Sequence, residues 1–519
     1  MNRRDFVAGG LLGATMLGQA IARENNQVAA ADTTTQGKIH DFAKVVDLAS
    51  SLSKESYQSD RLTLSGVFAD LDYDHYRGIR FRRDADPLSA SNHDFSMDLL
   101  PPGQLYQDRV RIYLVDKKQL AKEILFSSEV FDFDSNLFPA TSFSLTDEEK
   151  NGLGWSGFRL RFPINNDETD DEFVVFQGAS YFRAVARDTL YGLSARGLAI
   201  KTGDPAGEEF PRFSRFWIYV PATGAHAITV DALLESPSVT GAYRFEIYPG
   251  AETLFNVTCQ LFPRKTLEKY GIAPLTSMYY FSPTRRYHID DYRNAVHDSE
   301  GLAIHTGREA RLWRPLANPE VLQFSAFMDN NPKGFGLIQR ARQFNHYQDA
   351  EARYEKRPSV WVKPLSAWMQ GSVALVEIPT DNEFNDNVIT FWQGSTALEQ
   401  GMTYRFAYQL IWSQRGVRCK NRAQVAASRI GQSVNGKDTY TINIDYRFKH
   451  PVSIEALRFS PTASQGEILS THLLLLDEPA TVRASFDYRP VKGELAELQA
   501  NLVKDGHIVT ETWLYRWTN

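Results

Sequence analysis

The chain has 519 residues, of which 43% are hydrophobic and 12% are aromatic, so it is too long for one ordinary core and long enough for two folded domains. The formal net charge of −6 comes from mixed charges without a long basic run. This balance excludes the electrostatic surface expected for nucleic acid or for an anionic membrane, and a neutral polymer is the more natural ligand.

The first residues form a predicted targeting segment. Arg3 and Arg4 are a twin-arginine pair, and a modestly apolar stretch that contains glycines follows from Val7 to Ala22. The pattern resembles a twin-arginine export signal, which we assign to residues 1–31. The stretch is short and glycine-rich for a membrane span, so we expect export to the periplasm without stable membrane insertion. A weak N-terminal anchor is the alternative.

Beyond the signal, strands dominate the predicted elements. Helical periodicity is clearest near Asp41 to Leu52. Phe158–Phe162 and Phe216–Val220 alternate in the period of two that is typical of half-buried strands, and residues 440–448 do the same. The turn dipeptides Asn435-Gly436 and Asp505-Gly506 indicate hairpins. An all-β fold follows.

Two domains are predicted from the spacing of these strands. Residues 32–394 are expected to form one large β-sandwich, with long loops at 279–313 and 329–368 that are uncommon unless they are functional. We place a boundary near residues 394–401. Residues 402–519 carry about seven strand-like runs at regular spacing, which is typical of an immunoglobulin-like β-sandwich.

Acidic and aromatic residues gather between Gly271 and Gly394, in the composition expected of a carbohydrate site. Carboxyl groups move protons at a glycosidic bond, and flat aromatic faces stack on sugar rings. Asp298 and Asp386 are the candidate catalytic acids, and Asp386 directly precedes a predicted strand, where burial can raise the pKa of a carboxyl. On local sequence alone, each aspartate could instead close a turn through backbone amides.

Further residues of this region are candidates for binding a sugar. Asp329 opens an Asp-Asn-Asn-Pro turn and is expected to support the site rather than to catalyse. An aromatic residue of a large β domain belongs more often to the core than to a ligand surface, so only some are expected to touch sugar. The predicted substrate-binding set is Asp329, Lys333, Phe335, Tyr347, Tyr354, Trp361 and Trp392.

Other chemistries find no support in the sequence. It lacks Cys-x-x-Cys, His-Glu-x-x-His and P-loop motifs, and Gly334-Phe335-Gly336 lacks the third glycine of a dinucleotide site, so we expect no cofactor and no metal. Gly192–Gly197 has one residue too many for a serine nucleophile elbow. Cys259 and Cys419 are expected to be isolated thiols rather than a disulfide.

Several long segments resemble the periplasmic family of osmoregulated glucan biosynthesis proteins G and D. The matching segments extend over most of the predicted mature chain and are Gln177–Ala184, Tyr191–Ala199, Ser238–Tyr243, Gly271–Met278, Asp329–Gly336 and Arg357–Val362. The twin-arginine start resembles protein D more than protein G, whose members usually carry an ordinary secretory signal.

The resemblance implies both a fold and an activity. It implies a large galactose-mutarotase-like supersandwich joined to a smaller immunoglobulin-like sandwich, and inverting hydrolysis of linear β-1,2-glucan. The family's general acid matches Asp386 in Asn385-Asp386-Asn387, and its general base matches Asp298 in His297-Asp298-Ser299. In this family the proton is thought to travel through water or a substrate hydroxyl. Glu300-Gly301 departs from the family pattern, which bears on contacts with sugar more than on the carboxyls.

Three functional hypotheses stay open at this point. The first is an endo-acting β-1,2-glucanase, in which Asp298 activates water and Asp386 supplies the proton. The second keeps both carboxyls but lets a sugar hydroxyl attack, which makes a transglycosylase. The third is a non-catalytic protein that handles glucan or serves as a scaffold, with the C-terminal sandwich docking other glucan biosynthesis proteins.

Overall fold

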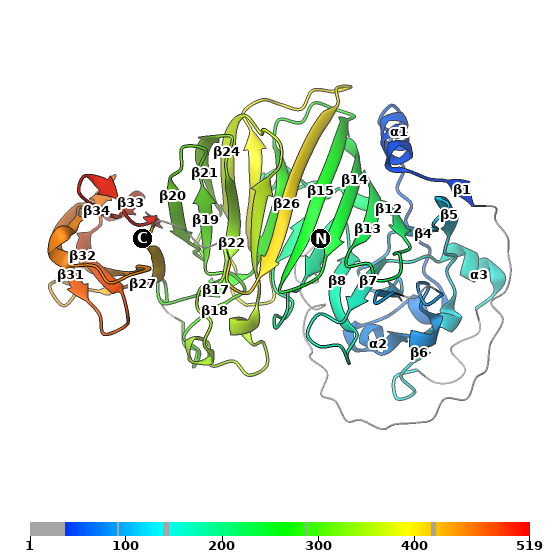
Figure 1. The fold of residues 1–519 in the computed structure, drawn as a ribbon, viewed down its shortest axis with the longest axis horizontal. Helices are drawn as coiled ribbons and strands as arrows, with labels where there is room; N and C mark the ends of the chain where they lie inside the picture. Colours follow the sequence, from blue (N-terminus) through cyan, green and yellow to red (C-terminus); the bar gives the residue numbers. More distant parts are fainter. Residues whose placement is uncertain (1–36, 91–92, 139–144, 287–288, 417–421, 519) are drawn as a thin grey trace.

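The computed structural model describes residues 37–90, 93–138, 145–286, 289–416 and 422–518. Figure 1 shows an elongated molecule, with the C-terminal strands at one end and the short N-terminal helices at the other. The predicted export signal, residues 1–31, and Cys419 lie outside the described residues.

The largest sheet crosses most of the length of the molecule. Among the described residues it has 15 strands, in the spatial order β1 (Lys38–Ile39), β5 (Leu120–Glu123), β4 (Arg111–Val115), β12 (Arg212–Tyr219), β13 (Ile228–Glu235), β14 (Val239–Tyr248), β15 (Glu252–Pro263), β26 (Tyr404–Ser413), β23 (Ser359–Pro364), β22 (Gly334–Ile338), β19 (Gly301–His305), β20 (Arg311–Pro315), β36 (Thr512–Trp517), β33 (Ala496–Ala500) and β30 (Thr462–Ala463). Most neighbours are antiparallel, but β4 with β12 and β20 with β36 are parallel pairs.

A second sheet packs against the first and completes the large sandwich. In the part of the chain that is described it has 10 strands, in the order β21 (Gln323–Asn330), β24 (Gln370–Glu377), β25 (Val388–Gly394), β16 (Tyr270–Ser277), β10 (Ser194–Arg196), β9 (Tyr181–Ala184), β8 (Asp171–Gln177), β7 (Gly157–Phe162) and β3 (Ser96–Leu100), with β11 (Leu198–Ile200) also paired to β16.

Aromatic side chains fill the space between the two sheets. Phe158 of β7 packs edge-on against Phe216 of β12 with ring centroids 5.0 Å apart, and Phe182 of β9 stacks on Phe255 of β15 at 5.6 Å. All four lie in one buried apolar cluster. Alternate residues of a strand face opposite sides of its sheet. This cluster therefore buries the inner face of each sheet, and the outer face is left to contact solvent or covering elements.

Helices are few and lie near the N-terminal end. α1 (Phe42–Leu52) is capped by Asp41, whose side chain accepts from the Lys44 amide, and it buries Val45 and Ala49 on the outer face of the large sheet. This agrees with the predicted helix. The remaining helices are α2 (Tyr73–Arg77), α3 (Asp147–Gly152) and the 3₁₀ turns η2 (Gly66–Phe68), η3 (Arg83–Ala85), η4 (Ser128–Val130), η6 (Phe344–His346), η7 (Tyr354–Lys356) and η8 (Ile454–Ala456).

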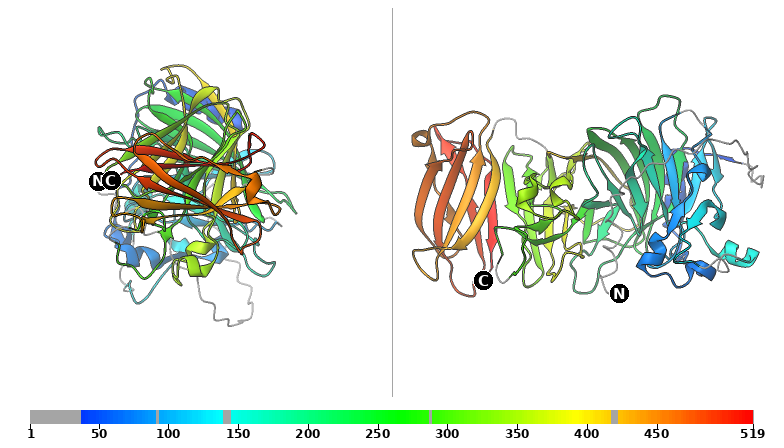
Figure 2. Two further views of the ribbon diagram at one scale, coloured as in Figure 1. Left: turned by 90° about the vertical axis from the view of Figure 1, so that its left-hand side faces the viewer. Right: turned by 90° about the horizontal axis from the view of Figure 1, so that it is seen from below.

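Smaller sheets complete the fold. In the C-terminal sandwich, a four-stranded sheet faces β36, β33 and β30 across its own apolar core (Figure 2). The remaining strands are β27 (Gln424–Gln432), β28 (Tyr440–Arg447), β32 (Thr481–Arg489) and β31 (Glu467–Leu475) of that sheet, β29 (Arg458–Phe459), β34 (Leu502–Lys504) and β35 (His507–Ile508), and the two pairs β17 (Tyr279–Phe281) with β18 (Val296–His297) and β2 (Ile79–Phe81) with β6 (Phe131–Phe133).

The all-β class predicted from the sequence is confirmed. β7, β12 and β28 cover the three predicted alternating runs, and Asp505-Gly506 forms the turn between β34 and β35 with positive φ at both residues, +50° and +78°. Two details differ. The predicted long loops contain strands: residues 279–313 include β17 to β20, and residues 329–368 include β22 and β23. At two to six residues, these strands are too short to show a clear alternation.

The domain boundary also falls later than residues 394–401. β26 lies between β15 and β23 in the middle of the large sheet, so the large sandwich extends to Ser413. Its alternating pattern does not reveal which sandwich it joins, because the pairing partners of a strand are distant in sequence.

Candidate active site

The segment from Ser277 to Tyr279, where β16 leads into β17, places both candidate acids. On one side, the Asn387 amide donates to the Ser277 carbonyl at 3.0 Å, and the Tyr279 amide donates to Asn387 Oδ1 at 2.8 Å. On the other side, the Asp298 amide donates to the Met278 carbonyl at 2.9 Å. Asp298 and Asp386, the residue before Asn387, therefore flank the same short stretch of backbone.

This arrangement sets the spacing of the two carboxyls. Neighbouring strands lie about 4.8 Å apart, so residues on either side of one strand lie roughly 10 Å apart between Cα atoms. Burial raises the pKa of Asp298, the Arg357 guanidinium lowers it, and the negative charge of Asp386 raises it again. The two carboxyls thus interact electrostatically.

Three arginines surround the carboxyls. Arg183 Nη2 of β9 lies 3.5 Å from Asp386 Oδ2, and Arg357 Nε lies 3.4 Å from Asp298 Oδ1. The negative charge of Asp386 also acts on Arg196 of β10, whose Nη1 is paired with Glu208 at 2.6 Å. Sequence reasoning did not select these arginines. The available signal was that all three stand in segments that match the family.

The segment that carries Asp298 is held rigidly by its neighbours. His297 Nδ1 shares a hydrogen bond of 2.9 Å with Gln339 Oε1, and Gln339 Nε2 donates to the carbonyls of His297 and Tyr354 at 3.0 and 3.1 Å. Tyr279 stacks on His297 with ring centroids 5.5 Å apart. Burial lowers the pKa of His297 to about 3, so the ring is neutral near pH 7. Its function there is to hold Asp298 in place.

The loop that carries Asp386 is anchored by one arginine. Arg293, in the segment between β17 and β18, pairs with Glu383 at 2.6 Å, Asp349 at 2.8 Å and Asp291 at 2.9 Å. Glu383 stands three residues before Asp386. Arg293 therefore joins three loops at the end of the sheet where both candidate acids lie (near the β17 and β18 labels of Figure 1).

All five aromatic residues predicted to bind sugar are buried in this structure. Phe335 and Trp392 lie in the main core, Trp361 in the core of the C-terminal sandwich, and Tyr347 and Tyr354 in a small cluster beside His297. None of the five is more than 6% exposed. An aromatic run in a β protein does not reveal which face of its strand is covered, and contact of these rings with sugar stays a prediction.

Asp329 and Lys333 lie at the wrong end of the sheet for contact with the carboxyls. Asp329 faces Gly371 of β24, which in turn faces Gly394 at the far end of β25 from Asp386. Six residues of strand separate these ends, roughly 20 Å. Asp329 accepts from the Gly307 amide at 2.9 Å and the Asn330 amide at 2.8 Å, and Lys333 pairs with exposed Glu309 at 3.7 Å.

Two other aromatic residues are open to solvent on the loops around the site. Phe384 lies two residues before Asp386 and is 60% exposed, and Tyr292, beside Arg293, is 77% exposed. Since Arg293 and Glu383 are paired, both rings stand on loops that are joined at the site. The sequence signal that could have identified these two rings is an aromatic residue inside a strongly polar run that lacks the alternation of a strand.

The described residues bear on the ligand sets and glycine motifs considered in the sequence. No group of three or more His, Cys, Asp or Glu side chains there could hold a metal ion. In Gly334-Phe335-Gly336, the two glycines are explained by packing, since a Cβ at Gly334 would lie 2.6 Å from Trp361 and one at Gly336 would lie 2.1 Å from the Val360 carbonyl oxygen. Cys259 is free and buried, as expected.

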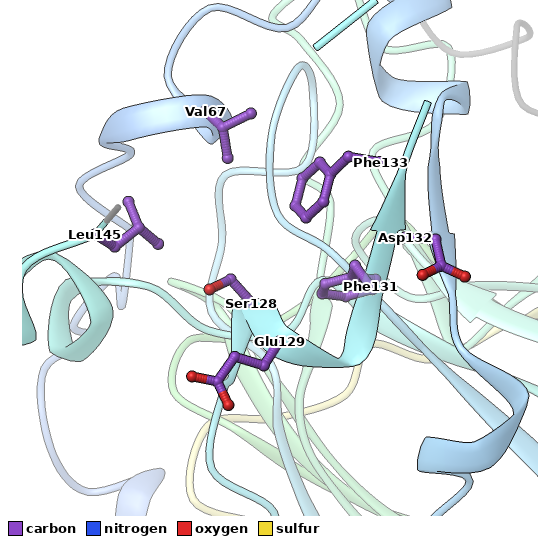
Figure 3. A pocket seen from close by; sticks show the side chains of 7 residues that line it. All are labelled: Val67, Ser128, Glu129, Phe131, Asp132, Phe133 and Leu145. Carbon is purple, nitrogen blue, oxygen red and sulfur yellow. The ribbon is translucent and has the colours of Figure 1, made fainter. Parts of the chain in front are cut away.

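A cavity of about 310 Å³ lies elsewhere, among the N-terminal elements. Figure 3 shows Phe133 and Phe131 of β6 beside it, near Val67 and Leu145. Its lining contains Glu129 and Asp132 but none of the residues around Asp298.

Comparison with known proteins identifies the family. The family model described as "Periplasmic glucan biosynthesis protein, MdoG" matches residues 40–517. The chain belongs to this family. Named relatives in the MdoG family include glucans biosynthesis protein G of Vibrio cholerae, 44% identical over 91% of this chain and 86% of the relative, and that of Shewanella frigidimarina, 42% identical over 96% and 89%.

The comparisons fit the family predicted from the sequence. The two relatives named above and one from Shewanella oneidensis carry the name of protein G, whereas the preference for protein D rests on the twin-arginine pair and stays a prediction. A galactose mutarotase related enzyme of Lactobacillus acidophilus is 9% identical, with a TM-score of 0.21, over 47% of this chain and 99% of that enzyme. A likeness this weak carries no weight for function.

In the described part of the chain, every helix is too short or too polar to cross a membrane.

Proposed function

We propose that this member of the MdoG family is a periplasmic, inverting endo-β-1,2-glucanase that acts on the backbone of osmoregulated glucans. The observation that carries the proposal is the pair of carboxyls, Asp298 and Asp386, on either side of the Ser277–Tyr279 segment. The family and the resemblance supply the substrate class, and the twin-arginine pair supplies the proposed export route.

The reaction follows from the positions of the two carboxyls. Asp298, as carboxylate, takes a proton from water, whose oxygen attacks the anomeric carbon on the face opposite to the leaving sugar. The bond from the anomeric carbon to the glycosidic oxygen breaks, and that oxygen receives a proton that originates at Asp386, directly or through a hydroxyl. A raised pKa suits Asp298 to this task, because a more basic carboxylate accepts a proton more readily near neutral pH.

The neighbouring groups allow both carboxyls to stand in one site. Arg357 and Arg183 lie beside the two carboxyls and limit their mutual repulsion. Phe384 and Tyr292 offer exposed faces on which glucose rings can stack at the edges of the site.

The test is cleavage of linear β-1,2-glucan by the purified mature protein, followed by proton NMR of product size and anomeric configuration. Short reducing products released first as the α anomer are expected. Asp386→Asn and Asp298→Asn should each lower kcat on the order of 10²–10⁴-fold, because each removes one proton transfer and keeps the shape of the side chain. Asp381→Asn, an exposed carboxyl of the same loop, is the matched control and should retain wild-type activity.

Each other outcome has a defined meaning. Wild-type rates in both Asp386→Asn and Asp298→Asn would contradict the catalytic roles. Cyclised or rearranged products without new reducing ends would point to transglycosylation, and an unchanged polymer would favour a protein that only binds glucan or serves as a scaffold.

A further inference from the structure

The residues on both sides of Asp298, His297 and Glu300, are bonded to one other segment, residues 338–341. The Glu300 amide donates to the Ile338 carbonyl at 2.9 Å, and Glu300 Oε2 accepts from the amides of Arg340 and Ala341 at 3.1 and 3.0 Å. Together with the two hydrogen bonds between Gln339 and His297, these contacts enclose Asp298 from both sides along the chain. Residues 338–341 therefore support the backbone on either side of Asp298, in addition to the bond from its own amide to Met278.

Residues 338–341 are in turn held by the C-terminal sandwich. Both terminal nitrogens of Arg340 bond to the carboxylate of Glu511, each at 2.8 Å, and the Val425 carbonyl also accepts from Arg340. The Val425 amide donates to Glu511 at 2.9 Å. Glu511 and Arg340 are largely shielded from water, with side chains 3% and 12% exposed. A bidentate pair of this kind fixes orientation as well as distance.

Packing restricts Arg340 further. Its guanidinium lies over the ring of Trp313 at 3.5 Å from the ring centre. Trp313 is itself placed by the parallel pairing of β20 with β36, in which Leu312 and Trp313 face Thr512 and Trp513. Glu511 directly precedes β36, so the strand pairing that joins the two sandwiches also brings Glu511 to Arg340.

We infer that the C-terminal sandwich is part of the catalytic apparatus: Glu511 is a positioning residue that, through Arg340 and Glu300, fixes the carboxylate of Asp298. The inference rests on the proposed glucanase activity for its kinetic consequence. The third hypothesis from the sequence treated this sandwich as a docking module, whereas the contacts give it a direct connection to the proposed base.

The experiment compares Glu511→Gln with the wild-type mature chain in two independent measurements. Glu511→Gln keeps the shape of the side chain but removes the charge that orients Arg340. We expect kcat on β-1,2-glucan to fall on the order of 10-fold or more with KM unchanged, because a small displacement of a catalytic group is costly. We also expect faster hydrogen exchange of the Glu300 amide, which donates to the Ile338 carbonyl, and of the Asp298 amide, which donates to the Met278 carbonyl and lies between the two residues that residues 338–341 hold.

Arg516→Gln is the matched control. Arg516 crosses the same interface, donating to the Phe324 carbonyl at 3.1 Å, but has no contact with residues 338–341. It should change neither kcat nor the exchange of Asp298. Arg340→Lys keeps the positive charge but loses the bidentate geometry, so it should reproduce the effects of Glu511→Gln. If Glu511→Gln does not fold, Arg340→Lys takes its place.

The two readouts separate failure of the inference from failure of the proposed function. If the wild-type protein does not cleave glucan, the exchange measurement still tests the connection from Glu511 to Asp298. Unchanged exchange and unchanged kcat in Glu511→Gln, with an active wild type, would overturn the inference and leave the glucanase proposal in place.

Discussion

At the residue scale, two opposing effects act on the pKa of Asp298. Burial raises the pKa of its carboxyl, and the Arg357 guanidinium, 3.4 Å away, lowers it. Because Asp298 must be ionised to act as a base, activity should be lost as the pH falls through its raised pKa. The acidic limb of the pH profile therefore reports the balance between these two influences.

Arg357→Met tests this balance. Removing the positive charge should raise the pKa of Asp298 further, so the acidic limb of kcat/KM should move to higher pH, by roughly 1 pH unit for a neighbouring charge at this distance. The measurement is kcat/KM for β-1,2-glucan across the pH range in which the protein stays folded. Arg357→Lys retains a charge and should move the limb less. A shift to lower pH in Arg357→Met would contradict the assignment of Asp298 as base.

At the element scale, the loop between β24 and β25 combines an acid with an exposed ring. Its rigid part is the pair between Arg293 and Glu383 at 2.6 Å, and its exposed part is Phe384. Side chains of a strand are committed to one face of the sheet, whereas a loop residue can turn toward solvent. The aromatic surface for sugar is thus expected on this loop, because the five aromatic residues predicted to supply it are buried.

Phe384→Ala is expected to weaken glucan binding without changing the chemistry. The loss of one stacking face should raise KM about 3- to 10-fold, in line with the strength of aromatic contacts, while kcat stays within about 2-fold. Titration of the inactive Asp386→Asn background with β-1,2-glucan measures the same effect on binding. Met328→Ala removes an equally exposed apolar side chain at the far end of β21 and should leave binding unchanged. An unaltered KM in Phe384→Ala would remove this ring from the proposed site.

At the scale of the whole molecule, the two sandwiches share one sheet and one apolar interface. β20 of the large sandwich pairs with β36 of the C-terminal one, and the C-terminal core includes Trp313, Ile338 and Trp361 from the large sandwich beside Trp513. Separating the sandwiches would expose these side chains to water and leave a sheet edge unpaired. We therefore expect the two to unfold together.

Calorimetry of the mature chain should show a single thermal transition. Trp313→Ala removes a large side chain from the shared interface and should lower Tm on the order of 5–10 °C while the transition stays single. Tyr292→Ala, which removes an exposed ring, should leave Tm unchanged. Two well-separated transitions in the wild-type chain would contradict shared unfolding and would also weaken the connection inferred from Glu511 to Asp298.

Features that depend on local order along the chain could be predicted from the sequence alone. Alternation identified the strands of β7, β12 and β28, the Asp505-Gly506 turn identified a hairpin, and long matching segments identified the family. Asp298 and Asp386 were selected from the short segments that contain them. Such features are visible because backbone preference and one-sided burial are set by residues a few positions apart.

Features that depend on strand order became visible only in the folded molecule. It brought Arg183 to Asp386 and Arg357 to Asp298, placed β26 inside the large sheet, and buried the rings of Phe335 and Trp392. It also joined Glu511 to the segment beside Asp298. The physical reason is that pairing and face coverage in a β-sandwich are made between residues far apart in sequence, and no local pattern encodes which distant strand a given face will meet.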